Sequence, residues 1–164
     1  MFSVEIKNDS ITTGLARAQA QLGDLTPVMN QIGEYLVMST KERFPTGTGP
    51  DGAKWAPKSP TTLARYGARK SNRVDTRPLF GPSGLLSSQI HHEAGPSQVE
   101  VGSNLVYAAV QQFGAGKGQF GKMANGSPIP WGNIPARPFL GIDKQDEPNI
   151  LALIADFLKP STAP

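Results

Sequence analysis

The stretch TPVMNQIGEYLVMSTKERF, residues 26–44, decides the fold. The Thr26 hydroxyl can cap a helix, and Pro27 suits the first helical position because no amide donor is needed there. Apolar side chains then recur at the spacing of one helix face: Val28, Met29, Ile32, Tyr35 and Leu36. We therefore expect a long helix from Thr26 to about Phe44 that ends before Pro45.

Patterns on either side of this helix predict a sheet and further helices. Residues 2–7 and 88–101 alternate between apolar and polar side chains, the second range around a Gly95-Pro96 turn, so we expect a strand and a β-hairpin. The other expected helices cover 12–22, capped by Thr12 or Thr13, 59–66, starting at Ser59-Pro60, 105–113, and a last segment from Asp143 or Asp146 to Leu158. The fold class is α+β: a small antiparallel sheet packed against a long helix and a C-terminal helix, with long Gly/Pro-rich loops.

Glycine and proline make up about a fifth of the chain, with 18 and 15 of its 164 residues. Because both residues interrupt helices and strands, they predict long loops, which gather at 45–60, 67–84 and 114–141. This length suits one domain, which we place at 1–158, followed by a disordered tail at 159–164.

Composition excludes several classes of protein. The absence of cysteine excludes disulfides, thiolate catalysis and cysteine-bound zinc. No run of about 18 apolar residues could cross a membrane, and the N-terminus lacks the basic and apolar regions of a secretory signal. We therefore expect neither membrane contact nor secretion.

Positive charge is concentrated in the middle of the chain. Residues 41–77 hold nine cationic and three anionic side chains, a net charge of +6, whereas the remainder has a net charge of −3. Such a distribution is typical of a surface that faces nucleic acid or an acidic protein partner. It is equally consistent with a solvated loop, because Trp55 and Tyr66 are the only aromatic residues between Lys54 and Arg77.

No pattern in the sequence carries a convincing chemical site. Residues 116–123 nearly fit a phosphate-binding loop, but Met123 stands where Ser or Thr would hold magnesium. His91 and His92 are adjacent on a strand, so they point to opposite faces and cannot chelate one ion together. A hydrolase would have to combine these histidines with upstream polar side chains: Asp75, Ser87 and Ser88. Since no nucleophile elbow is present, we expect no catalytic, cofactor-binding or metal-binding residue.

Two loop residues have a structural and a functional interpretation. Trp55 either fills the core or anchors a partner, and we favour the core. Arg137 projects from the proline-stiffened extended run 134–141. It either bonds a core-edge carboxylate or helix carbonyls, or contacts another subunit.

Read in order, these segments resemble the phage virion morphogenesis family, the tail-completion proteins of Mu-like and related contractile-tailed phages. The resemblance covers residues 1–158. Its pieces are Gly52-x-x-Trp55-x-Pro57 followed by Thr61 or Thr62, Leu79, Ser83-Gly84-Leu85-Leu86-Ser87-Ser88-Gln89-Ile90, Val99-Glu100-Val101-Gly102, Tyr107-Ala108-x-x-Gln111-Gln112-Phe113-Gly114 and Ile134-Pro135-Ala136-Arg137-Pro138-Phe139-Leu140-Gly141. Gln111 departs from the family, whose members often carry His before Gln-Phe-Gly, and this argues against a catalytic histidine there.

The resemblance implies a non-enzymatic virion protein that acts at the head–tail junction, in the neck or in tail completion. It also implies assembly in the host cytoplasm into a hexameric ring. The implied partners are further copies of the chain, phage tail tube or terminator proteins, head connector proteins, and DNA in the channel. Loops of this length cost conformational entropy to order, so we expect neighbouring subunits to supply contacts that offset it.

The expected interface residues are aromatic or cationic and lie mainly in the loops. They are Trp55, Arg65, Arg69, Lys70, Arg73, Arg77, Phe113, Arg137 and Phe139. The main alternative is a nucleic-acid-binding module that uses residues 41–77, and a more distant one is a hydrolase built around His91 and His92.

Overall fold

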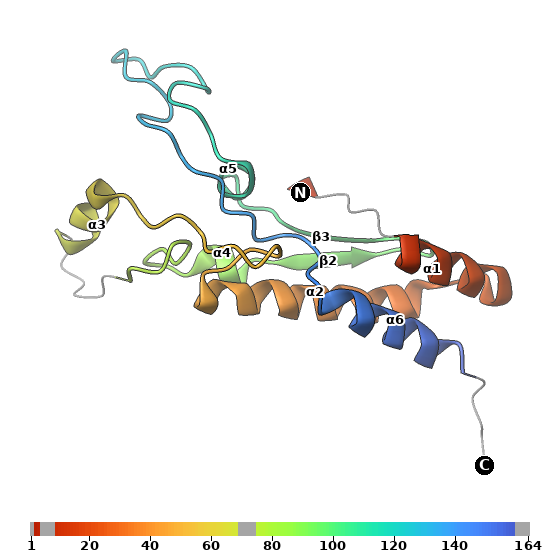
Figure 1. Cartoon of the computed structure of the whole chain (residues 1–164). Helices are drawn as coiled ribbons and strands as arrows, with labels where there is room; N and C mark the ends of the chain where they lie inside the picture. The colour runs from red at the N-terminus through yellow and green to blue at the C-terminus, as the bar shows by residue number, and fades with distance from the viewer. Residues whose placement is uncertain (1, 4–8, 69–74, 160–164) are drawn as a thin grey trace.

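The expected α+β fold is confirmed by a computed structural model of the chain, which describes residues 2–3, 9–68 and 75–159 (Figure 1). Its elements in chain order are β1 (Phe2–Ser3), α1 (Asp9–Leu22), α2 (Thr26–Thr46), α3 (Pro60–Gly67), α4 (Leu85–Ser88), β2 (His91–Ala94), β3 (Val99–Ser103), α5 (Ala108–Phe113) and α6 (Asp146–Phe157). The expected strand at 2–7 is represented by β1, and the rest of it, like the tail at 160–164, lies outside the described residues.

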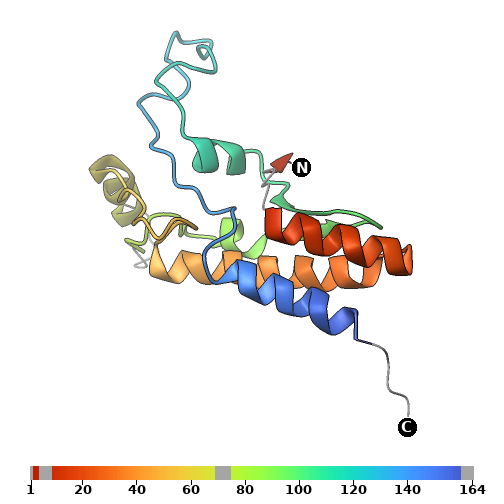
Figure 2. The ribbon, with the colours of Figure 1, turned by 45° about the vertical axis from the view of Figure 1, so that its right-hand side comes forward.

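Within the described residues, the sheet has three antiparallel strands in the order β1-β3-β2. The expected hairpin is confirmed, with His91 opposite Gly102 and Ala94 opposite Val99, although Ser88 belongs to α4 and not to the strand. Helix α2 packs against β2 and β3, α6 runs alongside α2, and α1 packs against α6 (Figures 1 and 2). The long helix is therefore the element on which the sheet and the C-terminal helix are assembled.

Two apolar clusters form the core, and α2 contributes to both of them. Near the N-terminal end of α2, the cluster joins this helix to α6 through Leu25, Val28, Met29, Ile32, Ile150 and Ile154. Near its C-terminal end, Phe44 packs among side chains from loops and short helices: Trp55, Leu79, Leu86, Ile90, Ala108, Phe139 and Leu140. Burial of this second cluster fixes the loops, whose local sequence specifies little regular structure.

The approach of α2 to the sheet depends on Gly33. A Cβ atom at this position would lie 2.4 Å from Cδ2 of His92 and 2.9 Å from Cγ2 of Val99. Both distances are shorter than van der Waals contact, so a larger side chain would push the helix away from the hairpin. The helical pattern of the sequence gives no sign of this requirement.

Both ends of α2 differ from the expectation. Thr26 does not cap the helix: Leu25 is the N-cap, and the Asp24 carboxylate accepts bonds from the amide and hydroxyl of Thr26. The helix also continues past Pro45 to Thr46. Pro45 sits in the last turn, where the missing amide removes one hydrogen bond, and burial of Phe44 holds the turn in place.

The shorter helices follow the expected caps more closely. The Ser59 hydroxyl accepts a hydrogen bond from the Thr62 amide, as the Ser59-Pro60 pair predicted. Before α6, the Asp143 carboxylate accepts bonds from the amides of Gln145 and Asp146. Helix α1 is an exception, because it begins at Asp9, before the cap that was expected at Thr12 or Thr13.

The second glycine-rich loop forms a projecting hairpin, which we call the arm (residues 114–134). It extends away from the layer of helices and sheet in both views (Figures 1 and 2). At its base, Ala115 and Ile134 exchange backbone hydrogen bonds of 2.9 and 2.8 Å. Further along, the Phe120 amide donates to the Ile129 carbonyl at 2.8 Å, and the Met123 amide donates to the Ser127 carbonyl at 2.8 Å. The arm is thus hydrogen-bonded within one chain, which the sequence did not predict.

Among the described residues, no helix combines the length and apolar character needed to cross a bilayer.

Candidate assembly site at the base of the arm

The extended run 134–141 is the point at which the separate motifs of the sequence meet. It was expected to be extended, and it contains no helix. Its Arg137 amide donates to the Gln111 carbonyl of α5 at 2.7 Å. The Trp55 indole donates to the Pro138 carbonyl at 2.8 Å. Segments around residues 55, 111 and 137 therefore form one hydrogen-bonded unit below the arm.

Arg137 holds this unit together from a buried position, with 7% of its surface exposed. Its Nε donates to the Ala56 carbonyl at 2.6 Å and its Nη2 to the Pro57 carbonyl at 2.8 Å. Its Nη1 donates to the Gln111 side chain at 3.3 Å. The expected carboxylate or helix-carbonyl partners were wrong, because the loop at 56–57 offers carbonyls that no regular structure satisfies. Burial lowers the pKa of Arg137 from its ordinary value.

Trp55 and Phe139 lie in the core. Trp55 is 6% exposed and meets the Phe44 ring edge-on, with 5.5 Å between the ring centroids. Phe139 is fully buried, and its ring centroid lies 5.7 Å from that of Phe44. The core interpretation of Trp55 is confirmed. Both aromatic rings are therefore part of the core and are not exposed for contact with another subunit.

Gln112 is a second buried anchor, which sequence reasoning missed. Its side-chain oxygen accepts bonds from the amides of Phe139 and Leu140 at 2.9 and 3.0 Å, and its nitrogen donates to the Leu140 carbonyl at 3.1 Å. The Gln112 side chain thus satisfies backbone groups of residues 139 and 140 that a neighbouring strand would otherwise satisfy. Gly114 follows with φ +75°, and a Cβ there would lie 2.8 Å from the Ala136 nitrogen and the Ile134 oxygen. The Gln-Phe-Gly pattern at 112–114 was the available signal.

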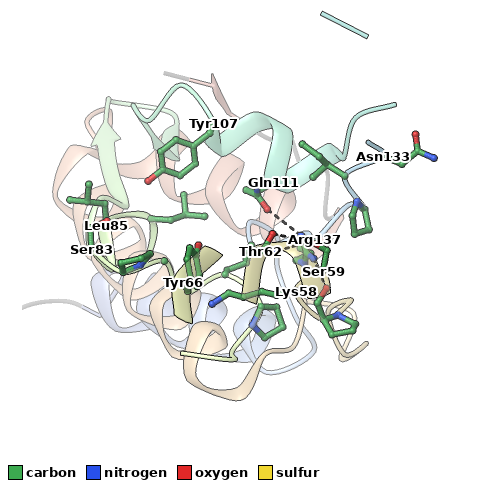
Figure 3. Close-up of a pocket in the computed structure, with 18 residues that line it drawn as sticks. Lys58, Ser59, Thr62, Tyr66, Ser83, Leu85, Tyr107, Gln111, Asn133 and Arg137 are labelled. Atoms are coloured by element: carbon green, nitrogen blue, oxygen red, sulfur yellow. Dashed lines mark hydrogen bonds between the residues drawn. The ribbon is translucent and has the colours of Figure 1, made fainter. Parts of the chain in front are cut away.

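A cavity of about 540 Å³ lies beside this junction (Figure 3). It is lined by α3, the segment 78–86, α5 and residues 133–137, and it is open to solvent on one side. Lys58 lies across it, donates to the carbonyls of Asp75 and Phe80, and has its ammonium 5.0 Å from the centre of the Tyr66 ring. Burial lowers the pKa of Lys58; Asp75 acts against this shift, and the positive charges of Arg77 and Arg137 add to it.

Three of the remaining expected interface residues lie at separate exposed positions: Arg65, Arg77 and Phe113. Arg65 is exposed and stacks on the Trp131 ring of the arm, 4.5 Å from its centroid. Arg77 pairs with Asp75 at 2.5 Å and lies 3.7 Å from the centre of the Phe80 ring. The hydrogen bonds from Arg77 hold the pKa of Asp75 below its ordinary value. Phe113 is 63% exposed at the end of α5. Arg69, Lys70 and Arg73 lie outside the described residues.

Several described cations of the basic span 41–77 are already engaged within the fold. Arg43 is buried against Asp146, and Lys58 is buried in the cavity wall. Lys54 donates to the Thr46 carbonyl. The span is therefore not a uniform basic surface.

The arm carries exposed apolar side chains. Phe120 and Trp131 are 53% and 55% exposed, and Met123 and Ile129 are also partly open to solvent. Apolar side chains grouped on a projecting segment are typical of a contact with another protein. Residues 116–123, which nearly matched a phosphate-binding loop, form part of this arm.

The polar residues around His91 are not brought together. Ser87 and Ser88 donate to the carbonyls of Gly84 and Leu85, one helical turn back. His91 bonds the Gln89 side chain, whereas His92 faces Gly33 of α2. Over residues 9–68 and 75–159, no group of three or more potential metal-binding side chains is found.

These features define a small α+β protein in which long loops and the arm meet at one buried, hydrogen-bonded junction. The chain belongs to the phage virion morphogenesis family, whose model matches residues 6–159. It is 31% identical over 160 residues to "Mu-like prophage FluMu G protein 2" of Haemophilus influenzae, covering 97% of both chains. It is also 30% identical over 152 residues to "Putative capsid assembly protein G" of Escherichia phage Mu, covering 88% of this chain and 90% of that one. No solved structure matches. Family membership supports a structural role in phage virion assembly.

Proposed function

We propose that the chain is a non-enzymatic structural protein that forms a ring at the head–tail junction of the virion, in the neck or in tail completion. Its partners in this proposal are neighbouring copies in a hexamer, tail tube or terminator proteins, and head connector proteins. The observation that carries the proposal is the arm, which presents Phe120 and Trp131 to solvent on a hydrogen-bonded hairpin. When another subunit covers apolar surface of this kind, the binding free energy becomes more favourable by about 25 cal/mol per Å² of apolar area removed from water.

A ring requires a contact between two different surfaces of the same chain, because each subunit must bind one neighbour on each side. The arm supplies one such surface, and it is anchored to the core through Gln112 and Arg137. A firmly held arm loses less conformational entropy on binding than a free loop would.

The oligomeric state of the purified protein tests this proposal. We expect rings in negative-stain micrographs and a sedimentation coefficient that rises with concentration. A protein that stays monomeric at every concentration and does not bind phage tails or connectors would contradict it.

Variants of the arm give the matched test. Trp131→Ser and Phe120→Ser should weaken ring formation while lowering the free energy of unfolding by no more than about 1 kcal/mol, because both side chains are about half exposed and Trp131 loses only a surface stack on Arg65. Met38→Ser, at a side chain that is 53% exposed on α2, is the control and should still form rings. In cells infected with a phage lacking this gene, the arm variants should leave unjoined heads and tails, and the control should restore particles.

The nucleic-acid alternative would rest on residues 41–77. It requires a binding constant whose logarithm falls steeply with the logarithm of salt concentration. The engagement of Arg43, Lys54 and Lys58 within the fold favours the assembly proposal.

A further inference from the structure

The cavity at the base of the arm contains two buried cations. Lys58 is 9% exposed and Arg137 is 7% exposed, and both line the same space (Figure 3). Their hydrogen-bond partners are backbone carbonyls and one amide oxygen, all of them neutral. Within residues 9–68 and 75–159, no carboxylate lies at ion-pairing distance from either side chain.

Burying a positive charge without a counter-ion is unfavourable, and two such charges in one cavity repel each other. Burial is the largest cause of the lowered pKa of Lys58; the charge of Asp75 acts against the shift, and the charges of Arg77 and Arg137 add to it. An anion placed between the two groups would relieve both effects. The cavity is therefore electrostatically suited to a negatively charged group.

The walls of the cavity are rich in proline and contain both apolar and polar groups. Four prolines line it: Pro57, Pro78, Pro82 and Pro135. Because proline fixes its own φ, these walls need little ordering when a ligand enters. Further lining hydroxyls can donate to a carboxylate: that of Tyr107, and one of the two hydroxyls of Ser59 and Thr62, which hydrogen-bond to each other at 2.9 Å. Its volume of about 540 Å³ can take side chains of another protein. Cations this deeply recessed suit a side chain better than a duplex phosphate backbone, whose charges are met by surface Lys and Arg.

Among the exposed carboxylates that have no ion-pairing cation in the described residues, two lie next to each other on the hairpin. Glu93 and Glu100 face each other across β2 and β3, and both are exposed. Like charges directly opposed across a ladder destabilise the strand pair. Glu100 accepts only a long bond of 3.5 Å from Gln98, and no described cation is at ion-pairing distance from either carboxylate.

We propose that the cavity of one subunit receives the carboxylates of Glu93 and Glu100 from the neighbouring copy. The inference rests on the proposed ring and names the chemistry of its contact. The two surfaces lie at different places along α2: Glu93 follows His92, which faces Gly33, whereas the cavity adjoins Leu79 and Leu86, which pack with Phe44. One subunit can therefore place its two glutamates in the cavity of one neighbour and receive the glutamates of the other neighbour in its own cavity, as a head-to-tail ring requires.

Neutralising the acidic pair is the first test. The double variant Glu93→Gln/Glu100→Gln removes the charge at exposed positions and should fold normally. We expect its dissociation constant for self-association, measured by sedimentation, to rise by about 30-fold or more. The control Glu34→Gln/Glu42→Gln makes the same charge change at two exposed positions of α2 and should assemble like the wild type.

Blocking the cavity is the complementary test. Lys58→Met removes one cation, and Tyr107→Glu places a negative charge at the partly exposed rim, so that the test does not depend on Lys58→Met folding. Each cavity variant alone should be monomeric. In an equimolar mixture, the acidic-pair variant still has an intact cavity, and Tyr107→Glu still has Glu93 and Glu100. One intact contact can therefore form between the two variants, and the mixture should contain dimers and nothing larger.

The outcomes separate the inference from the proposed function. If the wild type forms rings and the acidic-pair variant does so equally well, the inference is wrong and the ring stands. If the wild type never assembles, the proposed function itself fails. Retained rings in Tyr107→Glu, or monomers alone in the mixture, would also overturn the inference. So would binding of a short duplex DNA by the wild type that Lys58→Met and Tyr107→Glu abolish, because the cavity would then be a phosphate site.

Discussion

The Nη2 atom of Arg43 lies 2.6 Å from Oδ2 of Asp146, and this ion pair joins α2 to the first turn of α6. Both side chains are buried, at 5% and 1% exposure. Asp146 also accepts bonds from the hydroxyls of Tyr35 and Ser39 at 2.9 and 2.7 Å. The carboxylate is thus satisfied on all sides, which a buried charge requires.

The same guanidinium reaches the run 134–141 at the base of the arm. Its Nη1 donates to the carbonyls of Phe139 and Gly141 at 3.1 and 2.9 Å. Arg43 therefore fixes the end of the run 134–141, and Arg137 fixes its middle. The core of the fold and the base of the arm are held by one continuous set of hydrogen bonds.

Removing Arg43 should strongly destabilise the fold. We expect Arg43→Met to lower the free energy of unfolding by about 3–5 kcal/mol, because Asp146 would remain buried without its cation. Urea denaturation followed by circular dichroism measures the change. The double variant Arg43→Met/Asp146→Leu should recover part of the loss, and a loss below about 1 kcal/mol in the single variant would contradict the role given to the pair.

Gly33 should tolerate no side chain. Gly33→Ala places a Cβ within 2.4 Å of the His92 ring, so we expect about 1–3 kcal/mol of destabilisation despite the better helix propensity of alanine. Gly67→Ala in α3 is the matched control, because a Cβ at that position would meet nothing within 4 Å. Equal thermal stability of the two variants would show that helix and hairpin are not in close contact.

Gln112 should matter more than its neighbour Gln111. Gln112→Met leaves the amides of Phe139 and Leu140 buried without an acceptor, which should cost about 2–4 kcal/mol. Gln111→Met loses only the 3.3 Å bond to Arg137 and should cost about 1 kcal/mol. Hydrogen exchange at residues 139 and 140 should accelerate in the first variant and not in the second. The reverse order would show that Gln112 does not support this run.

The base of the arm should depend on Gly114. Gly114→Ala combines a positive φ with contacts of 2.8 Å to the Ile134 oxygen and the Ala136 nitrogen, so we expect about 1–3 kcal/mol of destabilisation and faster proteolysis within 114–134. Gly116→Ala is the control, since its nearest neighbour is the Gln119 side chain at 3.8 Å. Similar cleavage rates for both variants and the wild type would contradict the proposed rigidity of the arm.

Acid should weaken the contact between α2 and α6. Burial raises the pKa of Asp143, but bonds from the amides of Asp146 and Gln145 and from Arg43 outweigh it and hold that pKa below its ordinary value. A carboxyl group whose pKa is lower in the folded chain stabilises the fold above its unfolded pKa of about 4, and this contribution disappears as pH falls through the folded value. Urea melts below about pH 4 should show the loss, and Asp143→Asn should make the pH dependence shallower. An unchanged slope in that variant would exclude Asp143 as a source.

The sequence by itself determined the elements whose causes are local. Residues 26–44 became a helix because their apolar side chains recur at helical spacing, and the hairpin formed because its alternation flanks a Gly-Pro turn. The Ser59 cap and the extended run 134–141 follow from hydroxyl and proline chemistry within a few residues. Trp55 could be placed in the core from its size and apolar character alone.

Only the tertiary structure decided which distant groups meet. The pairing of Arg43 with Asp146 spans 103 residues, and no local pattern marks it. The same holds for Arg137 with Ala56, for Gly33 beneath His92, and for the glycine-rich loop that became an arm. Pro45 remained in a helix because burial of Phe44 outweighed one missing hydrogen bond. Spacing along the chain fixes backbone periodicity, whereas the partners of buried charges and loop carbonyls are selected only when the core closes around them.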